Sequence, residues 1–269
     1  MIAEIGGRRF EWGARTYVMG IVNVTPDSFS GDGLGADRVA AVEQGLRMVR
    51  EGADMLDVGG ESTRPGHVPI TATQEIARIE EVVGRLARES GVPVSVDTYK
   101  LEVAEAAVAQ GATILNDVWG LTRSPDLAAL AAATGCALVV MHNQDGTDYS
   151  GDLMEEIKRF LGEAVGRAVA AGVARERVIV DPGIGFGKTA EQNWEVMRRL
   201  AELKTLGQPI LMGTSRKSFI GKLLDLPVGE RVEGTAATVA ASVLRGADIV
   251  RVHDVLEMTR VARTADHMR

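Results

Sequence analysis

Polar side chains stand at the ends of several apolar segments, and these are the residues whose types could do chemistry. Residues 178–181, VIVD, run from β-branched residues into a carboxylate, and glycines follow at positions 183, 185 and 187. Glycines after such a segment let the backbone approach a ligand or adopt a positive φ. The corresponding ends of the other apolar segments are Asn23, Asp57, Asp97, Asn116, Met141, Arg251 and His253.

Two carboxylates and an amide could form one binding site. Asp97, Asn116 and Asp181 lie on apolar segments, where burial without a partner would be costly. Together they would supply hydrogen-bond acceptors and an amide donor for a flat heterocycle with N–H and C=O groups on one edge. An aminopyrimidinone edge would match a carboxylate through two parallel hydrogen bonds. Alternatively, each side chain caps a neighbouring loop or helix.

Cationic residues indicate a second subsite. Arg251 and His253 are two positions apart on one expected strand, so their side chains share a face. With Arg64, Arg216 and Lys217 from other loops they could bind an anion, and phosphate or diphosphate fits their chemistry. The alternatives are that Arg216 and Lys217 belong to a solvated loop and that His253 is a structural histidine.

These residues require elements that bring distant segments together. Apolar strands and helices alternate eight times, and a repeated pattern begins three of the strands at Gly52, Gly111 and Gly246. This alternation predicts an α/β fold, a (β/α)8 TIM barrel that forms a single domain over residues 1–269. A short N-terminal β extension would close one end. Active sites of such barrels lie at the carboxyl ends of the strands. A doubly wound open sheet is the alternative.

The predicted elements follow one another along the chain with two long loops, residues 24–35 and 59–71. The strands are expected at residues 17–23, 54–58, 93–97, 112–116, 136–141, 178–181, 209–213 and 248–253. The helices are expected at residues 37–51, 73–89, from 101 onward, 127–134, 152–171, 191–204, 235–244 and in a last segment toward 263.

Composition limits the class of protein. A chain of 269 residues, 45% hydrophobic and 25% charged, can bury a substantial core. Its net charge of −7 disfavours a nucleic-acid or membrane surface as partner. No apolar run reaches the roughly 18 residues of a membrane span, and no signal peptide is recognisable, so the cytoplasm is expected. Cys136 is the single cysteine, so an internal disulfide is excluded and a buried thiol is expected.

Five segments resemble the signatures of dihydropteroate synthases. Residues 19–30 read MGIVNVTPDSFS and residues 57–66 read DVGGESTRPG, which are similar to the first and second signatures. Residues 181–188 (DPGIGFGK), 213–221 (GTSRKSFIG) and 251–253 (RVH) match in the same order. The resemblance spans essentially the whole chain. It implies a transferase of folate biosynthesis, from the family that sulfonamides target. Such enzymes join 6-hydroxymethyl-7,8-dihydropterin diphosphate to 4-aminobenzoate and release 7,8-dihydropteroate and diphosphate.

The resemblance also implies where the pterin binds. Four polar residues would hold it: Asp97, Asn116, Asp181 and Lys217. Three further residues would line its pocket: Met141, Phe186 and Gly213. The lysine that matters in this interpretation is Lys217, whereas Lys188 has no role.

The other substrate groups are assigned in the same way. The resemblance implies that diphosphate is bound by Asn23, Arg251 and His253, with the cofactor Mg²⁺ reached through Asn23. Aminobenzoate and the diphosphate end would face Thr63, Arg64 and Ser218. The catalytic residues would be Asp97, Lys217, Arg251 and His253.

A dissociative reaction is expected, because the electron-rich dihydropterin ring can delocalise the positive charge left when diphosphate departs. Asp97 would favour this cation, and magnesium, Arg251 and His253 would stabilise the leaving diphosphate. The two long loops would exclude water. The first loop departs from the family pattern SFSDGG, since this chain reads SFSGDG and Asp32 is displaced by one place.

Other functions fit the same residues less completely. A pterin-binding barrel without transferase activity is conceivable because of the altered first loop. A Schiff-base aldolase would use Lys217, and a folate methyltransferase domain would leave the segment SRKSF at residues 215–219 unexplained. Relatives are commonly dimers, so the expected partners are two small-molecule substrates and a second copy of the chain, with no nucleic acid and no membrane.

Overall fold

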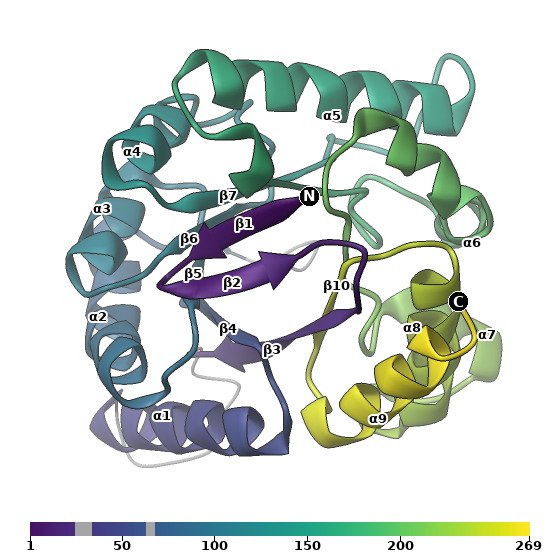
Figure 1. The fold of residues 1–269 in the computed structure, drawn as a ribbon. Coiled ribbons are helices and arrows are strands. Elements are labelled where there is room, and N and C mark those ends of the chain that lie inside the picture. Colours follow the sequence, from purple (N-terminus) through teal and green to yellow (C-terminus); the bar gives the residue numbers. More distant parts are fainter. Residues whose placement is uncertain (25–33, 63–67) are drawn as a thin grey trace.

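Eight parallel strands form a barrel with the helices outside it, and Figure 1 shows it from the end that the N-terminal hairpin covers. Along the sheet the strands follow the order β8, β7, β6, β5, β4, β3, β10 and β9. An isolated parallel bridge between Val180 and Ile210 joins β8 to β9 and so closes the barrel. The predicted (β/α)8 barrel is therefore confirmed, and the open doubly wound sheet is excluded.

The structure is a computed structural model that describes residues 1–24, 34–62 and 68–269. The barrel strands are β3 (Tyr17–Asn23), β4 (Met55–Gly59), β5 (Val94–Asp97), β6 (Ile114–Asp117), β7 (Ala137–Met141), β8 (Val178–Asp181), β9 (Leu211–Met212) and β10 (Ile249–Val252). Each lies within two residues of the strand predicted from the sequence. The pattern of apolar runs ending in polar residues was therefore sufficient to place all eight.

The barrel strands are buried on both faces, which explains why they read as continuous apolar runs rather than alternating ones. Successive side chains point to opposite faces. Ile114 accordingly belongs to the cluster inside the barrel, while its neighbour Leu115 packs against the helices outside. Cys136 is buried and has no disulfide partner, as expected.

The N-terminal segment closes the amino end of the barrel. The strands β1 (Ile2–Ile5) and β2 (Arg8–Glu11) pair antiparallel, and the hairpin lies across the barrel in Figure 1. Phe10 and Trp12 stack with ring centroids 5.4 Å apart, and both meet Tyr17 edge-on. These rings share one buried cluster with inward-facing strand residues. The expected hairpin is confirmed, and it leaves the carboxyl ends of the strands for a site.

The helices begin and end close to the predicted bounds, with one addition. They are α1 (Leu34–Glu51), α2 (Ala72–Glu89), α3 (Leu101–Ala109), α4 (Asp126–Thr134), α5 (Leu153–Ala170), α6 (Ala190–Arg199), α7 (Ser218–Leu224), α8 (Val232–Leu244) and α9 (Val255–Asp266), with 3-10 turns η1 (Arg175–Arg177), η2 (Leu200–Leu206) and η3 (Val228–Glu230). The helix expected to reach residue 204 continues as η2 after Arg199. The added helix α7 was expected as loop. Its seven residues include a glycine and have no side-chain cap, so local pattern gives little signal.

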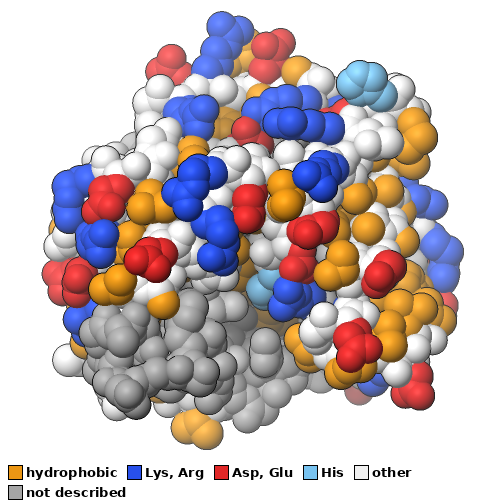
Figure 2. Space-filling view, turned by 90° about the horizontal axis from the view of Figure 1, so that it is seen from below, with side chains coloured by type: hydrophobic (Ala, Val, Ile, Leu, Met, Phe, Trp, Pro, Cys, Tyr) orange, Lys and Arg blue, Asp and Glu red, His pale blue; other side chains and the backbone are white. Residues whose placement is uncertain are grey.

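The surface carries charges of both signs. On the face seen in Figure 2, Lys and Arg side chains are interspersed with Asp and Glu. Within the described ranges, the helices are all too short or too polar to cross a membrane.

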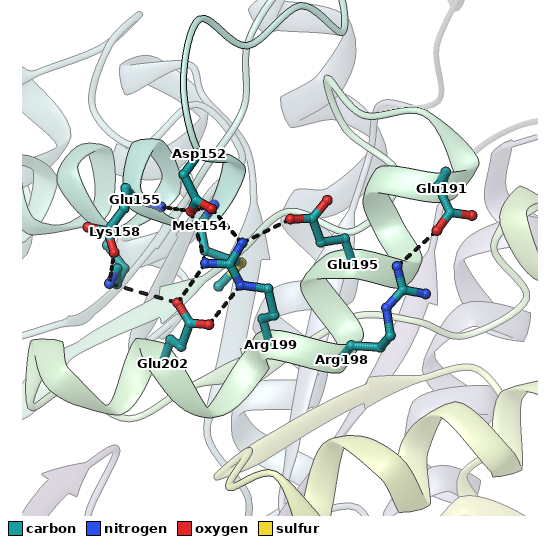
Figure 3. A network of polar contacts seen from close by, with 9 residues as sticks. All are labelled: Asp152, Met154, Glu155, Lys158, Glu191, Glu195, Arg198, Arg199 and Glu202. Atoms are coloured by element: carbon teal, nitrogen blue, oxygen red, sulfur yellow. Dashed lines mark hydrogen bonds and ion pairs between the residues drawn. The ribbon is translucent and has the colours of Figure 1, made fainter.

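An ion-pair network joins α6 to the start of α5 (Figure 3). The guanidinium of Arg199 donates to both carboxylate oxygens of Asp152, at 2.7 and 2.9 Å, and also to Glu195 and Glu202. The carboxylate of Asp152 also caps α5, since its Oδ1 accepts from two backbone N–H groups of the first turn. Its hydrogen bonds with Arg199, together with these caps, lower the pKa of Asp152 to about 2. The helices that follow β7 and β8 are thus tied together directly.

The substitution Arg199→Met should lower the melting temperature by about 2 to 4 °C, because it removes several ion pairs of one network at once. Arg198→Met is the matched control, since Arg198 lies on the same helix and pairs with Glu191 in an exposed position. Differential scanning calorimetry of both variants measures the difference, which about 0.5 M NaCl should reduce. Equal melting temperatures would show that the network contributes nothing.

Candidate active site

The carboxyl ends of the barrel strands surround one pocket. The parallel register sets Asp97 beside Asn116 and Met141 beside Asp181, and all four side chains line this pocket. The pocket is lined by Ile21, Asp97, Asn116, Val118, Met141, Asp181, Ile184, Phe186, Gly213, Ser215, Lys217, Arg251 and His253. Most of the residues predicted to form the site therefore lie together, although they come from segments far apart in the sequence.

Two predicted residues, Asn23 and Ser218, do not line this pocket, and two others lie outside the described residues. Asn23 ends β3 and is half-buried; its Oδ1 would be 3.8 Å from a Cβ placed on Gly59. Ser218 is exposed at the first residue of α7. Thr63 and Arg64 lie outside the described residues, as does Asp32.

A partly buried arginine is the centre of the polar contacts. The guanidinium of Arg251 donates from Nε to Oδ2 of Asp57, at 2.6 Å, and from Nη2 to Oδ2 of Asp97, at 2.9 Å. The amide of Asn116 donates to the same oxygen of Asp57, at 3.0 Å. Within the described residues, the Oδ1 atoms of Asp57 and Asp97 are buried without a hydrogen-bond partner. The oxygen of Asp97 is therefore an acceptor that a ligand in the pocket could use.

Asp57 is the residue that sequence reasoning left without a role. It lies in the middle of the buried strand β4 and is fully buried. A charged side chain on a buried strand needs a partner, and this requirement was the one signal in the sequence that Asp57 belongs to the site. Its partner could not be read from the sequence, because Arg251 is 194 residues away.

Burial sets the protonation of the acids. It raises the pKa of Asp97 to about 7, although the positive charge of Arg251 opposes the shift. Burial likewise raises the pKa of Asp181, against the hydrogen bond that Oδ1 accepts from the backbone N–H of Gly183 at 2.7 Å. For Arg251, burial favours the neutral form, but the neighbouring carboxylates outweigh it and keep the pKa above the usual value. A ligand with N–H donors would stabilise the ionised acids.

The ring of His253 contacts the hydroxyl of Ser215. Ser215 Oγ accepts a hydrogen bond from the backbone N–H of His253 at 3.1 Å and lies 3.0 Å from its Nδ1. Burial and the nearby charges of Arg251 and Arg216 lower the pKa of His253 to about 3, so the ring is neutral and carries one proton. In the tautomer whose Nδ1 accepts from the Ser215 hydroxyl, this proton resides on Nε2. His253 can donate this proton in a hydrogen bond within the pocket.

The two basic residues of the loop after β9 differ in their surroundings. Lys217 lines the pocket, with Nζ 4.1 Å from the centroid of the Phe186 ring. Arg216 pairs instead with Asp254, donating from Nε at 3.0 Å. The anion subsite considered from the sequence therefore retains Lys217, Arg251 and His253 in the pocket, while Arg216 is engaged elsewhere.

The glycines after Asp181 have the conformations expected of them. Gly183 has a φ of +70°, and a Cβ there would lie 1.9 Å from the carbonyl oxygen of His142. Gly185 has a φ of +81°, and its Cβ would meet the side chain of Lys217 at 3.0 Å. The loop thus approaches its neighbours more closely than any other residue type would permit.

Few donors for a magnesium ion stand at this end of the barrel among the described residues. Within the described residues no group of three or more His, Cys, Asp or Glu side chains could hold a metal ion. Asn23 does offer an amide oxygen at the carboxyl end of β3, next to the strand that carries Asp57. Mg²⁺ accepts such hard oxygen donors and commonly takes most of its ligands from water and phosphate. The donors present therefore fit a magnesium ion that arrives with diphosphate.

The barrel and its pocket agree with a class of known proteins, because residues 19–253 match the family described as pterin binding enzyme. The dihydropteroate synthase of Clostridium beijerinckii is 49% identical over 264 residues, which cover 98% of each chain. The structure of the Clostridium difficile dihydropteroate synthase in the presence of pteroic acid has a TM-score of 0.94 at 49% identity, over 96% of this chain and 98% of that one. The Xanthomonas albilineans dihydropteroate synthase with 4-aminobenzoic acid has a TM-score of 0.93 at 40% identity, over 99% and 97% of the two chains.

The chain belongs to the dihydropteroate synthase family. It is therefore a transferase, and the family predicted from its five signatures is confirmed. The roles of individual residues remain predictions that the pocket geometry supports.

The substitution Asp57→Asn should lower the free energy of unfolding by about 2 kcal/mol or more, because it removes one member of a buried ion pair while Arg251 keeps its charge. Glu191→Gln is the matched control, since it neutralises an exposed pair and should cost less than about 1 kcal/mol. Urea denaturation at pH about 7.5 measures both. Similar values for the two variants would show that the Asp57–Arg251 pair contributes no more than a surface contact.

Proposed function

We propose that this pocket condenses 6-hydroxymethyl-7,8-dihydropterin diphosphate with 4-aminobenzoate to give 7,8-dihydropteroate and diphosphate. One observation carries the proposal: Asp97, Asn116 and Asp181 line the same pocket as Lys217 and Arg251. Acceptors for a pterin edge and donors for an anion therefore face one space. The relatives solved with pteroic acid and with 4-aminobenzoic acid support this assignment.

The pterin would direct its N–H groups toward the carboxylates. Oδ1 of Asp97 is buried and has no partner in the described part of the chain, so it suits a ring N–H or an amino group. Asp181 is held in place by the backbone N–H of Gly183. Asn116 is oriented by its bond to Asp57. Each pterin-binding group is thus fixed by a second contact before the ligand arrives.

The chemical step breaks the C–O bond to diphosphate and forms a C–N bond to the arylamine, whose proton passes to solvent. The dihydropterin ring can delocalise the positive charge that develops at the reacting carbon, so a dissociative path is proposed. Ionised Asp97 beside the ring stabilises this cation, and Arg251 and His253 stabilise the departing diphosphate. Arg251 holds Asp97 in place and adds positive charge.

The second substrate would lie against the side chains of Phe186 and Lys217, which contact each other at the pocket. The amine of 4-aminobenzoate is a free nucleophile at neutral pH, so no general base is required. Thr63, Arg64 and Ser218 are proposed to contact this substrate and the diphosphate end on the basis of the family resemblance. Magnesium would be bound through Asn23 and would neutralise part of the diphosphate charge.

The pH profile tests the role of Asp97. Since its pKa is raised to about 7, the acid is protonated below that pH and ionised above it, so kcat/KM should fall about tenfold per pH unit below neutrality. Asp97→Asn should lower kcat by about 100-fold or more, with a much smaller effect on pterin affinity. The variant should also lose the pH dependence of kcat/KM that comes from Asp97 and keep only the pH dependence that comes from the substrate diphosphate.

The experiment incubates both substrates with Mg²⁺ at pH about 6 to 9 and quantifies dihydropteroate and diphosphate. Substrate binding without diphosphate release would favour a non-catalytic pterin-binding protein. An unchanged kcat in Asp97→Asn would remove this residue from the mechanism. Formation of product by the wild-type enzyme alone establishes the reaction.

We also propose that two copies of the chain associate through α7, η3 and α8. Leucine and valine side chains are exposed on these elements, at Leu223 (66%), Leu224 (43%), Val228 (45%) and Leu244 (45%). Hydrophobic side chains gather in Figure 2 toward the side that α7 occupies in Figure 1. A second copy would cover this apolar area, which water otherwise contacts.

Light scattering during size-exclusion chromatography should give the wild type twice the 28.6 kDa of one chain. Leu223→Lys should shift the mass to that of a monomer, because a lysine would be placed in the apolar contact. Met268→Lys is the control, since Met268 is equally exposed, at 62%, but lies at the C-terminus. Dissociation by both variants, or by neither, would contradict the proposed interface.

The surroundings of the enzyme complete the proposal. The whole chain is taken as one domain with two small-molecule substrates. The net charge of −7 supports the absence of nucleic acid and membrane surfaces among its partners. A cytoplasmic location is proposed, and the free cysteine agrees with it.

A further inference from the structure

A buried lysine lies behind the glycine-rich loop. Lys188 is 8% exposed, and its Nζ is 2.9 Å from Nδ1 of His142, 3.1 Å from the carbonyl oxygen of Gly183 and 3.0 Å from that of Phe186. An ammonium group has three N–H donors, so each donor finds one acceptor. The pocket is lined by Ile184 and Phe186 from this loop, while Lys188 binds the carbonyl oxygens of Gly183 and Phe186.

The third acceptor of the Lys188 ammonium group is Nδ1 of a neutral histidine, His142. His142 follows β7, is 3% exposed, and packs edge-on against Phe160. Burial, together with the charge of Lys188, lowers the pKa of His142 to about 3, so its Nδ1 is free to accept a hydrogen bond. Tyr149, from the same connection, donates its hydroxyl to the carbonyl of Gly187 at 2.8 Å. The β7–α5 connection therefore holds the glycine-rich loop at two points.

The carboxylate of Asp181 partly balances the positive charge of Lys188. Burial lowers the pKa of Lys188 to about 7, while the nearby carboxylate of Asp181 opposes this shift. The middle of the loop is fixed as well, because the backbone N–H of Gly185 donates to Oδ1 of Asn193 at 2.7 Å. The backbone on both sides of Phe186 is thus anchored, and its ring is half-buried beside Nζ of Lys217.

We propose that Lys188 is a positioning residue for the aminobenzoate subsite. By binding the carbonyls of Gly183 and Phe186 and the ring of His142, it fixes the backbone of the loop and so the place of the Phe186 ring. This inference rests on the proposed function. Asp97 and Asn116 are held by Arg251 and Asp57, outside this loop, whereas Asp181 accepts a hydrogen bond from Gly183 within it. Most of the polar pterin contacts therefore remain when the loop moves, and pterin binding should be affected less than binding of the second substrate.

Lys188→Met retains most of the apolar stem but removes all three donors. It should raise the KM for 4-aminobenzoate about tenfold and leave kcat and the pterin Kd within about threefold. His142→Leu should act in the same direction, whereas His142→Gln keeps an acceptor and should restore most of the affinity. Lys204→Met is the matched control, since Lys204 is exposed on η2. An unchanged KM, or an equal loss of affinity for both substrates, would overturn the proposal.

A second measurement is independent of turnover. The chain contains five phenylalanines, and 4-fluorophenylalanine labelling with ¹⁹F NMR can assign Phe186 through the loss of its resonance in Phe186→Leu. That resonance should shift or broaden in Lys188→Met and His142→Leu but not in His142→Gln or Lys204→Met. An identical resonance in all variants would refute the positioning role. If the wild type forms no dihydropteroate but the resonance responds, the proposed function fails and the positioning of Phe186 stands. If Lys188→Met does not fold, the two His142 variants decide the question.

Discussion

The site depends on two ion pairs that share one arginine. The guanidinium of Arg251 lies between the carboxylates of Asp57 and Asp97. In a medium of low dielectric a carboxylate without a partner takes up a proton instead of remaining charged. The guanidinium opposes the rise in the pKa of Asp97 and leaves one oxygen of that carboxylate unpaired within the described residues. The same contacts connect β10, β4 and β5, so the group that sets the charge of the pocket also holds its strands in register.

The barrel strands carry apolar side chains near their amino ends and polar side chains near their carboxyl ends. The residues that stabilise the fold and the residues that form the site are therefore at opposite ends of the barrel. Inward side chains near the amino ends, such as Met19, Ile114 and Ile249, pack with the aromatic rings of the hairpin. At or next to the carboxyl ends of β5, β6 and β8, carboxylates and an amide face the pocket. The four-residue strands β5 and β8 thus contribute their first half to the core and their last residue to the site. The cost of burying polar groups is confined to the end where substrates would supply their partners.

The fold could be predicted because its signals are local. Each strand is an apolar run of a few residues, and each polar strand end is visible beside it, which placed Asp97, Asn116 and Asp181 correctly in one pocket. The pairing of Arg251 with Asp57 and of Lys188 with His142 depends on which segments become neighbours, and no local pattern records that. The helix α7 was missed for a different reason, since seven residues containing a glycine do not show a helical period. Predictions for Thr63, Arg64 and Asp32 fall outside the described residues.

The barrel is joined unevenly around its circumference. Between β8 and β9 the described residues form a single bridge, whereas the other neighbouring strands pair through two to five residues. The loop after β8 carries Phe186 and the loop after β9 carries Lys217, so the pocket spans this weak seam. A molecule that contacts both side chains connects the two edges where the sheet supplies the fewest hydrogen bonds. Occupancy of the pocket and protection of the β8 and β9 amides against hydrogen exchange are therefore coupled properties of this barrel.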